Sequence, residues 1–146
     1  MMVRLRSPRV VYVFGNPDLP RDSLPLRLLP KIKVLLPGID FRVHDPHEEW
    51  EIEEEITIVD TVEDLRKVRV FDDLEHFYLA PRVTVHDFDA LANLRYLQKL
   101  GRVKRVKIIG VPPDLSEEKA LSQVSKILLS RVRPHIDEFM ISSNQP

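Results

Sequence analysis

Four short, mainly apolar runs most constrain how this chain of 146 residues can fold. Strands that are buried on both faces have continuous hydrophobic sequences, whereas half-exposed strands alternate with polar residues. The runs predict buried parallel strands at residues 10–14, 41–43, 56–59 and 106–109. A fifth run, at residues 68–71, is short and predicts an antiparallel strand at an edge of the same sheet.

Two helices are expected from capping residues and apolar spacing. Asp22 or Ser23 can cap a helix that continues to about Leu36, and Pro30 is expected to kink it. Ser116 can begin the last helix, in which acidic residues occupy the first turn and arginines the last. This order of charges suits the helix dipole.

A third helix is predicted after His86. Residues 83–85 are expected to form an extended approach to this histidine, and Asp87 or Asp89 can cap the helix that follows. Gly101 is the expected C-terminal stop, because glycine readily adopts the left-handed conformation that ends helices.

Strands that alternate with helices in this way predict an α/β fold, a three-layer sandwich with a mostly parallel sheet flanked by helices. The length favours one domain over residues 1–146, with a core at about 9–133 and a polar tail at 134–146. The link at residues 44–55 is unusual, because it joins two predicted strands but is too short for a comfortable crossover helix.

Composition excludes several classes of function. The 22 basic residues nearly balance the 23 acidic ones, which argues against a nucleic-acid partner. The chain has no cysteine, so a thiolate metal site and a cysteine nucleophile are excluded. No apolar stretch approaches the roughly 20 residues of a membrane span, so a cytoplasmic protein is expected.

Polar side chains follow several of the predicted strands. Asn16 and Asp22 come after the first strand, Asp45 after the second, Asp60 ends the third, and His86 closes the run at 83–85. Ligands of parallel sheets gather at the carboxyl ends of the strands. Two carboxylates and an imidazole, from Asp22, Asp60 and His86, would suit a divalent ion such as nickel or zinc.

Each of these residues also has a purely structural interpretation. Asp22 and Asp60 can cap helices or turns, and His86 can be satisfied by internal hydrogen bonds. The chain has only four glycines and lacks a glycine-rich phosphate loop, so no nucleotide cofactor is expected. No serine lies in a nucleophile elbow.

Four segments in a set order resemble the nickel–iron hydrogenase maturation endopeptidases. They are GNPDLPRD at 15–22, ITIVD at 56–60, VTVHDF at 83–88 and IIGVPP at 108–113. The resemblance extends from about Val10 to Leu129 and implies a fold of the phosphorylase/hydrolase-like type. It also implies that Asp22, Asp60 and His86 contact metal and form the catalytic site, with Asn16 and Asp45 as further cleft residues.

The resemblance implies an activity and a partner. These endopeptidases recognise nickel already inserted in the precursor of a hydrogenase large subunit and then remove its C-terminal extension. Nickel would belong to the substrate, although another divalent metal could replace it in vitro. As a hypothesis for the reaction, the metal polarises the peptide carbonyl or a water while a carboxylate acts as base.

The chain departs from the family in its loops. Ser23 and Pro25 follow the first acidic ligand where glycines are usual, and Pro46 and His47 follow Asp45 in place of a glycine-rich turn. Two alternatives to a peptidase therefore stay open. One is a non-catalytic assembly factor that binds a hydrogenase precursor, with the acidic run at 48–55 as a possible contact. The other is a structural α/β domain.

Overall fold

The computed structural model describes residues 10–44, 50, 55–74 and 85–130, with side chains from residue 92 onward in the helix that begins at Val85. Within these ranges, no helix combines the length and apolar character needed to cross a bilayer. The strands are β1 (Val10–Val13), β2 (Asp40–Val43), β3 (Glu55–Thr61), β4 (Arg69–Phe71) and β5 (Arg105–Val111). The helices are the short 3-10 helix η1 (Pro20–Asp22), α1 (Leu24–Leu35), α3 (Val85–Lys99) and α4 (Glu117–Ser130).

The five strands form one sheet in the order β2-β1-β3-β5-β4. Neighbouring strands are parallel from β2 to β5, and β4 pairs with β5 in antiparallel register at the edge. All five predicted strands are therefore present, including the antiparallel edge strand. The parallel register aligns Asp60 with Gly110 and so brings the carboxyl ends of β3 and β5 together.

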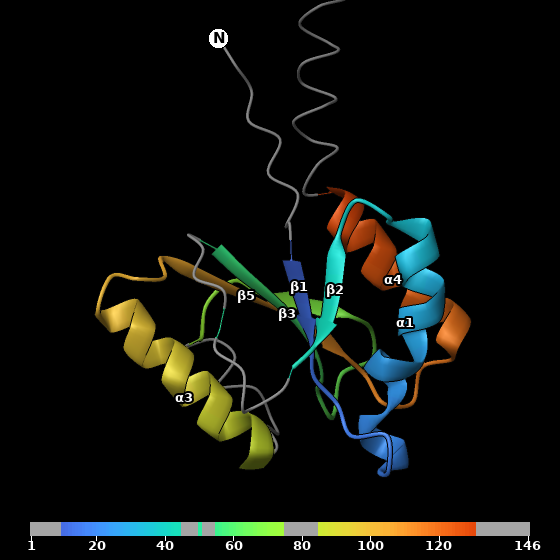
Figure 1. Cartoon of the computed structure of the whole chain (residues 1–146). Coiled ribbons are helices and arrows are strands. Elements are labelled where there is room, and N and C mark those ends of the chain that lie inside the picture. The colour runs from blue at the N-terminus through green and yellow to red at the C-terminus, as the bar shows by residue number, and fades with distance from the viewer. Residues whose placement is uncertain (1–9, 45–49, 51–54, 75–84, 131–146) are drawn as a thin grey trace, which may run out of the picture.

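The sheet is the middle layer of three. Helix α3 covers one face, and α1 and α4 cover the other (Figure 1). Successive strand residues serve opposite faces, so Ile108 packs in the core on one side and Ile109 in the core on the other, and both are fully buried. Burial on both faces is the reason that β1 is continuously apolar, whereas β2 at the edge is mostly exposed and includes Asp40 and Arg42. The predicted three-layer sandwich is confirmed.

Helix ends agree with the capping predictions in two places. The Ser116 hydroxyl accepts a hydrogen bond from the Lys119 amide at 3.2 Å and caps α4. After α3, the Arg102 amide donates to Leu97 O and the Gly101 amide to Gln98 O, with Gly101 at φ +77°. These two bonds form a Schellman motif, which requires a residue in the left-handed region.

The start of α3 differs from the prediction. Val85 is already helical, so the expected extended approach at 83–85 is wrong at this residue, while 83 and 84 lie outside the described residues. Asp87 and Asp89 are helical residues and cannot be the N-cap. The physical reason is that a short valine-rich segment is compatible with the first turn of a helix as well as with an extended chain.

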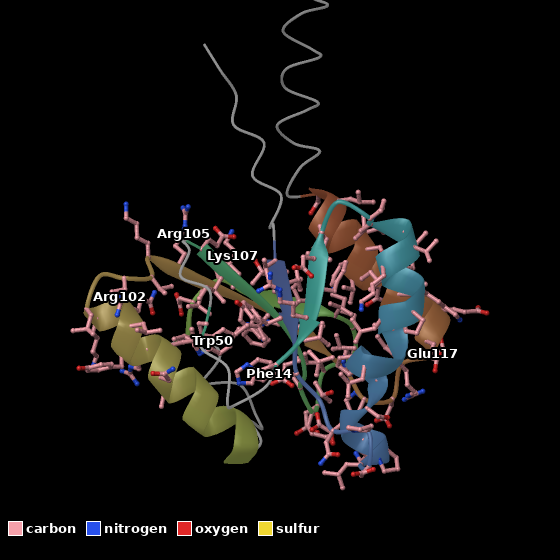
Figure 2. All side chains as sticks on the ribbon, viewed as in Figure 1. Phe14, Trp50, Arg102, Arg105, Lys107 and Glu117 are labelled. Carbon is pink, nitrogen blue, oxygen red and sulfur yellow. The ribbon has the colours of Figure 1, made fainter. Side chains whose placement is uncertain are left out.

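The link between β2 and β3 crosses over β1, because β2 and β3 lie on opposite sides of it. Trp50 is the described residue within this link, and it is buried. Its indole packs edge-on against Tyr12 with ring centroids 4.7 Å apart, on the face of the sheet that α3 covers. Figure 2 shows Trp50 and Phe14 between the sheet and that helix. Trp50 thus anchors the described part of this link to the face of the sheet that α3 covers.

Candidate functional site at the carboxyl ends of the strands

The segment after β1 folds back on itself and returns Asp22 to the end of the strand. The Asn16 amide donates to the Asp22 carbonyl at 2.9 Å, and the Asn16 side chain accepts from the Asp18 amide at 2.9 Å. This close return depends on Gly15, because a Cβ at that position would lie 2.8 Å from the Asp22 carbonyl oxygen. Asn16, predicted as a cleft residue, therefore has a structural role in this loop.

Asp22 is the last residue of η1 and is partly buried, with Oδ1 shielded from solvent. Ser23 occupies the N-cap position of α1, but its hydroxyl donates to Pro20 O at 3.0 Å and makes no capping bond. Ser23 is therefore the N-cap residue by position, as predicted, but not through a side-chain hydrogen bond. Helix α1 includes Pro25 near its start and is continuous through Pro30 to Leu35.

Asp60 lies in β3, one residue before its end, on the face that α3 covers. Its Oδ1 accepts a hydrogen bond from the Thr61 amide at 2.8 Å, and the residue is 1% exposed. A peptidase interpretation expects an accessible carboxylate here. In this structure Asp60 is instead buried and accepts a local hydrogen bond, which is what the structural interpretation predicts.

His86 belongs to the first turn of α3, and its side chain lies outside the described residues. The beginning of α3 and the helix η1 both lie toward the end of the sheet at which β1 and β2 terminate (Figure 1). The backbone segments that carry Asp22, Asp60 and His86 therefore lie toward the same end of the sheet, at the carboxyl ends of the parallel strands. Asp45 lies outside the described residues.

Among the side chains that the structure describes, no three histidine or carboxylate groups are close enough to hold a metal ion. This result covers Asp22 and Asp60 but not the imidazole of His86. The predicted ligand set of two carboxylates and one histidine therefore stays a prediction.

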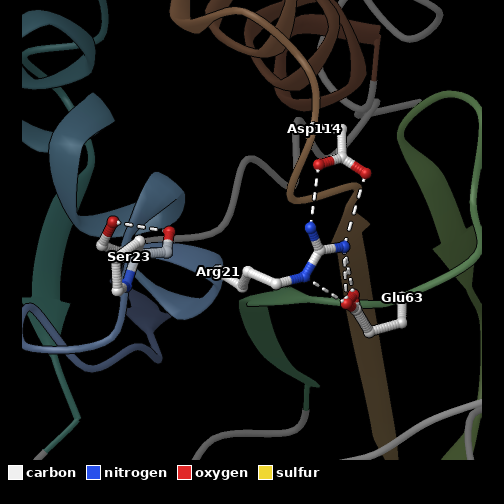
Figure 3. A network of polar contacts seen from close by, with 5 residues as sticks. Arg21, Ser23, Glu63 and Asp114 are labelled. Atoms are coloured by element: carbon white, nitrogen blue, oxygen red, sulfur yellow. Dashed lines mark hydrogen bonds and ion pairs between the residues drawn. The ribbon is translucent and has the colours of Figure 1, made fainter.

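A polar network at this edge was not predicted from the sequence. Arg21 donates to both oxygens of Glu63, from Nε and Nη2, at 2.8 Å each. Its Nη1 also donates to Asp114 Oδ1 at 3.0 Å (Figure 3). The hydrogen bond to Glu63, and then that to Asp114, raise the pKa of Arg21 above its ordinary value. No sequence pattern could reveal these pairs, because the partners are 42 and 93 positions apart.

An aromatic stack also lies at this edge. The His44 ring, just after β2, is stacked on Phe14 and on Trp50, with centroid separations of 4.6 Å in both cases. The His44 amide donates to Val13 O at 2.9 Å and so extends the pairing of β1 with β2. These contacts anchor the beginning of the β2–β3 link against the first strand.

Comparison with known proteins gives structural relatives and no sequence relatives. No protein-family model and no curated protein sequence matches the chain. The hydrogenase maturating endopeptidase HybD from E. coli has a similar structure, with a TM-score of 0.59 and 18% identity over 84% of this chain and 93% of that one. An uncharacterized protein from Wolinella succinogenes is similar over 90% of this chain and 98% of its own, with a TM-score of 0.52 and 17% identity. The sheet, its flanking helices and their order thus give this chain the fold of the hydrogenase maturating endopeptidase HybD.

Proposed function

We propose that this chain is a divergent hydrogenase maturation endopeptidase, which removes the C-terminal extension of a nickel–iron hydrogenase large-subunit precursor. The observation that carries the proposal is the likeness to HybD over 84% of the chain and 93% of the relative. The likeness covers most of both chains, and α/β proteins bind their ligands at the carboxyl ends of the strands, where the proposed site lies.

The proposed site consists of Asp22, Asp60 and His86. Carboxylate and imidazole donors with open coordination positions suit a borderline ion such as nickel. In this proposal nickel enters with the precursor and is part of the substrate, so the protein needs neither a resident metal nor a nucleotide. The loop closed by Gly15 and Asp22 supports it, because it returns the backbone of Asp22 to the end of β1, which pairs with the strand that carries Asp60.

The proposed chemistry is hydrolysis of one peptide bond. Nickel held by the precursor polarises the scissile carbonyl or the attacking water, and one aspartate takes the proton from that water. Asp22 is the better candidate for this base, because it is the less buried of the two carboxylates. Asp60, at 1% exposure, can take part only if precursor binding opens its surroundings.

The burial of Asp60 also favours a second candidate function. A protein of the same fold that binds the precursor without cutting it needs no accessible catalytic carboxylate. Ser23 and Pro25, which replace the usual glycines after Asp22, are both buried where α1 begins, so the loop at this point differs from that of a typical peptidase of the family. Binding without cleavage is the result that separates this candidate from the peptidase.

The test is a nickel-dependent cleavage assay on a co-expressed large-subunit precursor. The native chain is compared with Asp22→Ala, Asp60→Asn and His86→Ala. Asparagine is chosen at position 60 because it keeps an oxygen for the Thr61 amide while it removes the charge. Asp18→Ala is the matched control, since Asp18 is an exposed carboxylate in the same loop as Asp22.

Release of the C-terminal fragment by the native chain and by Asp18→Ala, with loss in all three site variants, is expected. Each site variant should lose at least about a hundredfold in rate, the usual scale for removal of an acid–base or electrostatic group. Co-purification of uncut precursor with the native chain would instead establish the assembly factor. If the precursor is neither bound nor cut, the proposal is wrong.

A further inference from the structure

Arg21 joins three segments that are distant in sequence. It precedes Asp22 in η1, and its guanidinium is paired with Glu63 after β3 and with Asp114 after β5. The pair with Glu63 is bidentate, and its shortest distance, between Arg21 Nη2 and Glu63 Oε1, is 2.7 Å. A planar guanidinium held by two carboxylates fixes orientation as well as distance.

The Glu63 end of this network is tied to Asp60 by a short, ordered stretch of backbone. Asp60 accepts from the Thr61 amide, and the Val62 amide donates to Val111 O at 3.0 Å. Only Val62 and Thr61 therefore separate Asp60 from Glu63, and both have their amides held. The end of β3 is thus fixed in its pairing with β5, and Glu63 ties Arg21 to this fixed point.

We propose that Arg21 is a positioning residue, which holds the loop of Asp22 against the loop that follows Asp60 and so sets the separation of the two carboxylates. The effect of Arg21 on catalysis rests on the proposed function. The coupling of the two loops through the guanidinium of Arg21 does not. Arg21 itself is given no contact with the substrate.

A neighbouring ion pair serves as a matched comparison. Arg27 Nη1 donates to Glu117 Oε1 at 3.0 Å and connects α1 with the start of α4. Both arginines are largely exposed, and both link the same N-terminal region to the chain that follows β5. Arg27, unlike Arg21, has no hydrogen bond or ion pair with the loop after β3 among the described residues. Exposed pairs of this kind contribute little to stability, so the two variants should unfold alike.

The first experiment measures amide hydrogen exchange in the full chain without a precursor. Arg21→Ala and Glu63→Gln should each speed exchange by about two- to fivefold in residues 15–24 and 61–66 together, a scale set by exposed ion pairs. Arg27→Ala should leave residues 61–66 unchanged. Unchanged exchange at 61–66 in Arg21→Ala, or equal acceleration there in Arg27→Ala, would overturn the inference.

The second experiment measures the rate of cleavage over a range of nickel-loaded precursor concentrations, which gives kcat and KM separately. Arg21→Ala should lower kcat by about tenfold with KM nearly unchanged, because a small misplacement of catalytic groups slows chemistry more than binding. Arg21→Lys should recover only part of this loss, since lysine cannot reproduce the bidentate pair. The Arg21→Ala and Glu63→Gln effects should not add, because both break one linkage.

The results separate the two proposals. Cleavage by the native chain with equal kcat in Arg21→Ala overturns the positioning role and leaves the peptidase standing. Absence of cleavage by the native chain, with the coupled change in exchange, overturns the peptidase and leaves the linkage between the loops established.

Discussion

The carbonyl oxygen of Asp22 lies 2.8 Å from the point that a Cβ on Gly15 would occupy. A contact this short involves backbone on both sides and cannot be relieved by a change of rotamer. The return of the chain after β1, and with it the position of one candidate ligand, therefore requires glycine at position 15. The carboxylate itself plays no part in this requirement.

Gly15→Ala should displace η1 and lower the free energy of unfolding by about 1–3 kcal/mol, as overpacked sites do. Urea denaturation measures this loss. Gly38→Ala is the control, because nothing lies within 4 Å of a Cβ at that position. The control should be neutral or slightly stabilising. Equal stability of the two variants would show that the loop has room for a side chain.

Leu94 tests how α3 is attached to the sheet. It is fully buried in the core on that face, whereas Tyr96 on the same helix is 60% exposed. Leu94→Ala should therefore cost about 2–5 kcal/mol of unfolding free energy. Tyr96→Ala should stay within about 0.5 kcal/mol of the native chain. Similar losses from the two substitutions would contradict the packing of α3 described here.

Gly101 ends α3 with a positive φ of 77°. Gly101→Ala should destabilise the protein by about 1 kcal/mol, because a Cβ is unfavourable in the left-handed region. Gly101→Asn should cost less, since asparagine tolerates this conformation. The midpoint temperatures of thermal unfolding of the native chain, Gly101→Asn and Gly101→Ala, measured at one pH, should fall in that order. An alanine variant as stable as the native chain would contradict the C-terminal motif.

The cap of α4 gives a further prediction. Ser116→Ala removes the oxygen that accepts from the Lys119 amide and should lower stability by about 1 kcal/mol. Ser116→Asp keeps an acceptor and should restore most of the loss. The urea concentration at the midpoint of unfolding measures both effects, provided that the dependence of the unfolding free energy on urea is the same in all variants. A full loss in Ser116→Asp would show that the hydroxyl acts in some other way.

Some features of the candidate site depend on a few consecutive residues, and others depend on contacts between distant segments. Local pattern was enough to predict that Asp60 ends a buried strand, because one strand end is a matter of a few consecutive residues. The depth to which Asp60 is enclosed depends on what covers that face, and no local pattern records it. The pairing of Arg21 with Glu63 could not be predicted either. Charged residues are frequent throughout the chain, and which of them become neighbours depends on the tertiary structure.

The amino-acid sequence by itself determined the layers of this protein: five strands, the edge position of the fifth predicted run, and the ends of α3 and α4 at Gly101 and Ser116. These features depend on the spacing of apolar residues and on hydrogen bonds between residues a few positions apart. Both can be read from a short stretch of sequence. Only the tertiary structure decided the strand order, the closing of the loop from Gly15 to Asp22, the burial of Asp60 and the partners of Arg21. Each of these depends on surfaces from segments that are distant in the chain, and such surfaces meet only when the sheet has formed.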